Sequence, residues 1–149
     1  MIQTFLIIAL SICGFFVAKY IRRHKKQNKP LVCPIRFDCH TVVHSDYSKF
    51  FGVPVEILGM AYYAFTAIFY SVMIVLNYIL VLNSINELPE PMVFLFLPLF
   101  ALMPLLSLVA FLFSTYLIGV QIFILKKGCS WCIVSAIISA IIFALVFFF

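Results

Sequence analysis

Charged residues are scarce in this chain, and acidic residues are the scarcest. Only 10% of its 149 residues are Asp, Glu, Lys or Arg, and only five are acidic, whereas 66% are hydrophobic. A soluble domain of this length would be about half apolar. This composition therefore excludes an ordinary soluble globular protein. The mean hydropathy of +1.21 indicates that the protein is embedded in membrane lipid, which is its expected partner.

The chain also lacks a polar stretch long enough to form a separate soluble domain. Its longest polar segment, about 19–56, is short, so we expect one integral membrane domain over 1–149. The first apolar run has no basic segment before it and no small-x-small cleavage site after it. It is therefore predicted to be a retained helix rather than a cleaved signal peptide.

Four apolar stretches are each long enough to cross a bilayer as a helix, which needs roughly 20 residues. The third stretch, as one helix, would be ~52 Å long, too long for one membrane thickness and too short for two spans with a turn. We predict one long span that is kinked near Pro104. The predicted fold is an all-α membrane protein, a four-transmembrane-helix bundle with a cysteine-bearing cap loop, 21–56, between spans one and two. The predicted spans are 2–20, 57–83, 92–126 and 129–149.

This span count places two cysteine pairs at the same membrane face. The cap loop carries Cys33 and Cys39, and after two more crossings the chain returns to that face at Cys129 and Cys132. The fifth cysteine, Cys13, lies in the middle of the first span and is expected to be a small buried apolar residue. The basic cluster 22–29 beside a span is expected to contact anionic lipid headgroups rather than nucleic acid.

The C-x-x-C pair suits redox chemistry because both sulfurs lie within one helical turn. At a helix N-terminus the macrodipole favours the thiolate, which is the species that attacks disulfides. A redox relay between the two pairs is the first interpretation. Permanent structural disulfides are the second, and the third is a zinc site with His40 or His44 as substitute ligands; no bound metal is predicted.

The residues around the cap loop resemble the vitamin K epoxide reductase family. The loop cysteine pair is followed by a serine six residues after Cys39, by a Phe-Gly-x-Pro segment over 51–54 and by Gly59, and C-x-x-C opens the last span. The resemblance covers nearly the whole chain. It implies a quinone-linked thiol–disulfide oxidoreductase that acts on a quinone of the ubiquinone or menaquinone type.

The resemblance also implies roles for individual residues. Cys33 would receive electrons from an outside partner, Cys39 would exchange with Cys129, and Cys132 would meet the quinone ring. Ser45 would hydrogen-bond a quinone oxygen, although it is also a candidate N-cap for a short helix over 46–51. Three aromatic side chains are candidates for capping the quinone pocket, with plain packing as their alternative: Tyr47, Phe50 and Phe51.

Two departures from the family pattern shape the expected activity. Many bacterial members carry a fused thioredoxin-like domain, whereas this chain stops at Phe149, so we expect a separate thioredoxin-like partner. Animal members have a tyrosine soon after the C-x-x-C, and 133–136 lacks one, which favours disulfide generation over epoxide reduction. The rival from another class is a membrane structural or metal-binding protein whose cysteines act as staples or zinc ligands.

The distribution of basic residues and the disulfide chemistry predict opposite orientations of the protein in the membrane. All ten basic residues fall on the predicted cysteine face, and the positive-inside rule would place that face in the cytoplasm. Disulfides persist outside the cytoplasm, so the cysteine chemistry would place the same face outside. We expect a multi-pass protein of the plasma membrane with its active face extracytoplasmic.

Overall fold

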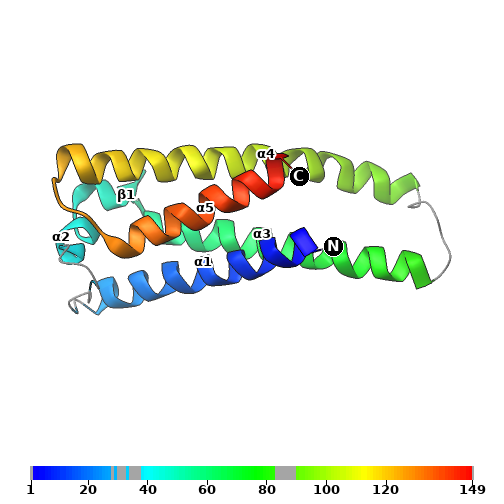
Figure 1. Cartoon of the computed structure of the whole chain (residues 1–149), viewed down its shortest axis with the longest axis horizontal. Helices are drawn as coiled ribbons and strands as arrows, with labels where there is room; N and C mark the ends of the chain where they lie inside the picture. Colours follow the sequence, from blue (N-terminus) through cyan, green and yellow to red (C-terminus); the bar gives the residue numbers. More distant parts are fainter. Residues whose placement is uncertain (1, 28, 30–32, 34–37, 83–89, 149) are drawn as a thin grey trace.

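The computed structural model describes residues 2–27, 29, 33, 38–82 and 90–148. Within this part of the chain, four helices are long and apolar enough to cross a membrane, which confirms the predicted all-α membrane bundle. They are α1 (Ile2–Lys26), α3 (Val55–Leu82), α4 (Glu90–Gly119) and α5 (Ser130–Phe148). Figure 1 shows them side by side, with the small elements of the cap gathered at one end of the bundle.

Helix α1 extends beyond the predicted span 2–20, whereas the helical segment that begins at Glu90 ends close to the predicted residue 126. Helix α1 continues to Lys26 rather than Tyr20, because arginine and lysine are good helix formers whose long side chains reach water. Helix α4 passes through Pro98 and Pro104 without ending, as expected for a single long span. It then continues as a π-helix, η2 (Val120–Ile124).

The cap between α1 and α3 holds a short helix and a tight hairpin. Helix α2 (Cys39–Val43) is followed by a 3-10 turn, η1 (Asp46–Ser48), and by paired strands β1 (Lys49–Phe50) and β2 (Val53–Pro54). The predicted helix over 46–51 is therefore wrong beyond Ser48. Phe51 and Gly52 have φ angles of 50° and 81°, and a two-residue turn with both φ positive suits a hairpin.

Helix α1 packs against α3 and α5, while α4 packs against α5. Close approach to α3 depends on Gly14, because a Cβ there would lie 2.5 Å from the Cε1 atom of Tyr63. Ser11 and Gly14 face this contact and are buried. Cys13 is exposed instead, so its predicted burial is wrong: neighbouring helix positions point about 100° apart, which turns Cys13 to the outside of the bundle.

Candidate active site

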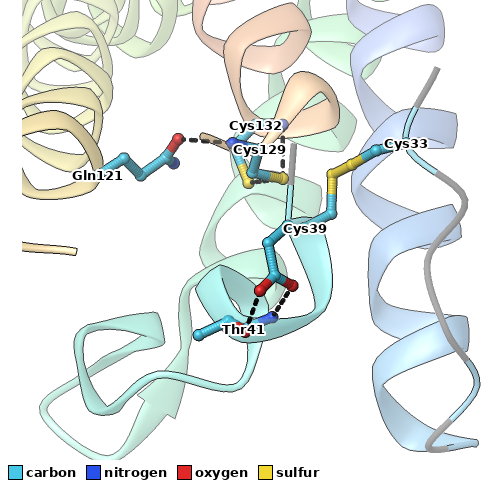
Figure 2. The surroundings of a disulfide bond; sticks show 7 residues. Cys33, Cys39, Thr41, Gln121, Cys129 and Cys132 are labelled. Carbon is cyan, nitrogen blue, oxygen red and sulfur yellow. Dashed lines mark hydrogen bonds between the residues drawn. A yellow bond between two sulfur atoms is a disulfide. The ribbon is translucent and has the colours of Figure 1, made fainter. Parts of the chain in front are cut away.

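The four predicted redox cysteines meet where the cap covers the start of α5. Cys39 and Cys129 are 1% and 0% exposed, and both belong to one apolar cluster. Cys33 and Cys132 pack against this cluster and are partly buried. Cys33 and Cys39 form a disulfide, and in Figure 2 Cys39 lies between Cys33 and the C-x-x-C pair.

The C-x-x-C pair is a pair of thiols in close contact. Cys129 is the residue just before α5, and its Sγ accepts hydrogen bonds from the Sγ of Cys132 at 2.7 Å and from the backbone N–H of Cys132 at 3.3 Å. Cys129 thus caps the helix with its sulfur. These bonds to sulfur lower the pKa of the Cys129 thiol, with burial acting in the opposite direction. The arrangement therefore favours deprotonation at Cys129 over deprotonation at Cys132.

A π-helical turn brings a polar side chain to this pair. Gln121 lies in η2, is 5% exposed, and accepts the backbone N–H of Cys129 through its Oε1 at 3.3 Å. π-Helical turns inside α-helices are frequently found at functional sites. The sequence analysis missed Gln121, although a single amide within the apolar stretch 92–125 was an available signal.

An ion pair ties the two cysteine segments together from the outside. The Nζ of Lys127 lies 2.6 Å from Oδ2 of Asp38, so the residue before Cys39 is joined to a residue just before Cys129. Asp38 also accepts hydrogen bonds from the backbone N–H and the hydroxyl of Thr41, at the start of α2. The bonds from Lys127 and Thr41 lower the pKa of Asp38 to about 2, so its carboxylate stays charged.

A cavity of about 810 Å³ lies beside the C-x-x-C, lined mainly by aliphatic and aromatic side chains of α3, α4, α5 and the cap. Cys132 lines it, together with Ser45, Tyr47 and Phe50, so the structure brings four predicted residues to one space. Phe51 does not line it and is 93% exposed. The ring of Phe50 packs edge-on against Phe113 of α4.

Ser45 precedes η1 but makes no side-chain cap bond there, which corrects the N-cap alternative. Its hydroxyl donates to the carbonyl oxygen of Val42 at 2.7 Å instead.

Tyr63 is a further polar neighbour that the sequence analysis did not select. The stretch after the C-x-x-C lacks a tyrosine, but the Tyr63 hydroxyl from α3 donates to the carbonyl oxygen of Ser135 at 2.8 Å, and both residues line the cavity.

A zinc site needs three or four ligand side chains around one point. Among the described residues, no group of three or more His, Cys, Asp and Glu side chains is arranged to hold a metal ion. The two histidines named as substitute ligands, His40 and His44, stack on each other, and Nδ1 of His44 bonds the carbonyl oxygen of His40.

A bundle of membrane helices with a disulfide and a thiol pair packed together at one end defines a membrane thiol–disulfide oxidoreductase. Residues 5–147 match the model of the vitamin K epoxide reductase family. The chain therefore belongs to that family, whose members work with quinones. No curated protein matches the chain significantly.

Proposed function

We propose that this protein generates disulfides by passing electrons from the dithiol of a separate thioredoxin-like protein to a membrane quinone of the ubiquinone or menaquinone type. The observation that carries the proposal is the position of Cys132, which contacts Cys129 on one side and lines the 810 Å³ cavity on the other. Small-molecule pockets usually enclose roughly 300–1,000 Å³ and are mostly apolar with few polar groups. The cavity fits a quinone ring on both counts.

The first steps use the cap. A thiolate of the partner attacks Cys33, which is the more accessible member of the loop disulfide, and the Cys33–Cys39 bond breaks to leave a thiolate at Cys39. A second partner thiolate then breaks the mixed disulfide, so the partner leaves oxidised and the loop pair is reduced. Cys39 is buried beside Cys129 in one cluster, which places it for the next exchange.

In the second exchange, the Cys39 thiolate attacks Cys129 of an oxidised C-x-x-C pair, and Cys33 then closes the loop disulfide again. The result is a loop disulfide with a C-x-x-C dithiol, which is the combination present in the structure. A quinone bound in the cavity would accept two electrons and two protons. Cys129 and Cys132 supply both electrons as they form their own disulfide, and Ser45 and Tyr47 would contact the ring.

The direct test is alkylation of the four cysteines with and without quinone. The protein is reduced in lipid, mixed with ubiquinone or menaquinone, and treated with a maleimide large enough to shift its mobility in a gel. We expect excess quinone to protect all four cysteines, because the loop pair and the C-x-x-C pair are both oxidised to disulfides. Equal alkylation in both samples would contradict quinone reduction and favour a purely structural role for the cysteines.

The Ser45 prediction separates a role in quinone binding from a role in the fold. The Ser45 hydroxyl has one proton, so it must turn from the Val42 carbonyl to donate to a quinone oxygen. Ser45→Ala should then slow quinone reduction about fivefold, since a hydrogen bond contributes on the order of 1 kcal/mol. Ser71→Ala is the matched control, because Ser71 also donates to a backbone carbonyl at 2.7 Å but does not line the cavity. If Ser45→Ala changes only the thermal midpoint, as the control does, the hydroxyl serves the cap alone.

Orientation is tested by labelling in intact cells. The last turn of α1 is basic, Lys49 lies in β1 of the cap, and Lys127 pairs with Asp38 of the cap. These elements are at one end of the bundle (Figure 1), so the charge rule still opposes the extracytoplasmic face that we propose. After reduction, a membrane-impermeant maleimide should label Cys33 and, because Cys39 is buried, label Cys39 more slowly. Labelling of Cys33 only after lysis would instead place the active face in the cytoplasm. A Cys33→Ser variant shows which signal belongs to Cys33.

A further inference from the structure

One carboxyl group is buried next to the active site without a role in the thiol exchange. Glu56 lies in the first turn of α3, and its side chain is 8% exposed. Its Oε1 accepts a hydrogen bond from the Nζ of Lys25 at 2.9 Å. Its Oε2 is also buried, and no group in the described part of the chain bonds to it. A buried charged oxygen without a partner is costly, so this arrangement needs an explanation.

The Glu56 side chain is part of the cavity wall. Glu56 lines the same cavity as Cys132, and among the described residues that line it Glu56 alone carries a carboxyl, ammonium, guanidinium or imidazole group. The negative charge of the carboxylate also acts to raise the pKa of the Cys129 thiol, against the hydrogen bonds that lower it. Glu56 thus combines three features: a bond to α1 through Oε1, a free Oε2, and a place on the cavity wall that Cys132 also lines.

The redox reaction moves protons as well as electrons, and the Glu56 carboxyl group is a candidate to carry the protons. When two thiols form a disulfide they release two electrons and two protons, and reduction of a quinone to a quinol consumes two of each. Electrons leave through Cys132, but the protons need an acceptor and donor inside a mainly apolar space. A carboxylate on the wall of the cavity that Cys132 also lines is suited to general acid–base catalysis.

We propose that Glu56 is the proton carrier of the quinone site, taking a proton from the Cys129–Cys132 pair and donating it to a quinone oxygen. Each of the two thiol protons follows this route in turn: the S–H bond breaks as the carboxyl O–H bond forms, and the carboxyl then releases that proton to a quinone oxygen. Glu56 ends each turnover as it began, and the two sulfurs supply both electrons. This inference rests on the proposed function and names a further catalytic residue for it.

The first experiment measures the place of the carboxyl group rather than activity. The full-length protein in lipid nanodiscs is treated with dicyclohexylcarbodiimide, an apolar reagent that modifies carboxyl groups, and the modified residues are identified by mass spectrometry. We expect Glu56 to be modified and to be protected by excess menaquinone or ubiquinone. Asp46, an exposed acid on the cap, serves as the internal control whose modification quinone leaves unchanged.

The second experiment measures a single turnover of the pre-reduced protein with quinone. Glu56→Gln keeps the shape of the side chain but carries no transferable acid proton, and it should slow quinone reduction on the order of 100-fold. Glu56→Asp should recover part of the loss. Exchange from the loop pair to the C-x-x-C pair, followed without quinone, should keep its rate because that step uses only thiolates.

Lys25→Met is the matched control for the lost ion pair, since it removes the bond to Oε1 and keeps the carboxyl group. It should retain most of the quinone reduction rate. The inference is overturned if Glu56→Gln turns over at the wild-type rate, if Lys25→Met loses as much as Glu56→Gln, or if quinone leaves carbodiimide modification of Glu56 unchanged. Failure of the wild-type protein itself to reduce quinone would overturn the proposed function instead.

Discussion

Replacing Cys132 by alanine is expected to abolish quinone reduction while leaving the protein folded in the membrane. Cys132 is the one cysteine that lines the cavity, and without its sulfur Cys129 has no partner with which to form the C-x-x-C disulfide. The substitution removes one sulfur at the cavity wall and keeps the bond from the backbone N–H at position 132 to Cys129. We therefore expect a loss of unfolding free energy of only about 1 kcal/mol.

The measurement is quinone absorbance during turnover with a dithiol donor, together with thermal unfolding of the same sample. Cys13→Ala is the matched control, because Cys13 is a free cysteine on the outside of α1 and away from the cap. It should leave both measurements at wild-type values. Wild-type turnover in Cys132→Ala would remove the C-x-x-C pair from the reaction and with it the whole relay.

The second large effect is expected at the loop pair. Cys33→Ala and Cys39→Ala should each block oxidation of a thioredoxin-like protein, because such a partner is too large to reach Cys129, which is fully buried under the cap. A small membrane-permeable dithiol should still be oxidised, since it can reach the Cys129–Cys132 pair directly. The two substrates thus separate the loop step from the quinone step in one preparation.

The two loop variants should differ from Cys132→Ala in a defined way. Quinone reduction with the small dithiol stays measurable in both loop variants and is absent from Cys132→Ala. The cap should keep its place without the disulfide, because Val42 and Val43 are buried and the Asp38–Lys127 ion pair remains. Oxidation of the protein partner at the wild-type rate in Cys33→Ala would contradict the order of the relay.

Much of the site was predictable because it depends on the order of apolar and polar segments. Counting four spans was enough to place Cys33, Cys39, Cys129 and Cys132 at one face, and the structure packs them into one cluster. Some residues belong to the site only because their side chains point towards it, and these were harder to predict from the sequence. Phe50 and Phe51 are neighbours in the sequence, but the tight turn directs Phe50 to the cavity and leaves Phe51 exposed.

Helix ends and helix faces were the other source of error. Cys13 is buried or exposed according to the face that α1 turns towards α3, and that face is set by the fit of Gly14 beneath Tyr63. Gln121 reaches Cys129 because a π-helical turn ends α4. Neither feature follows from hydropathy, because the Gly14–Tyr63 contact joins segments far apart in the chain and the Gln121 bond depends on a local departure from α-helical geometry.

The sequence by itself determined the solvent, the four helices and the face on which the cysteines meet, because burial in lipid fixes the length and the apolar character of each span. Only the tertiary structure decided what surrounds the sulfurs. It placed Cys132 on a cavity between α3, α4 and α5 and brought Glu56 to the same wall. It also made Cys129 a thiol that accepts two hydrogen bonds from Cys132. The physical reason is that the charge and reactivity of a buried group depend on a few close neighbours, and packing chooses those neighbours.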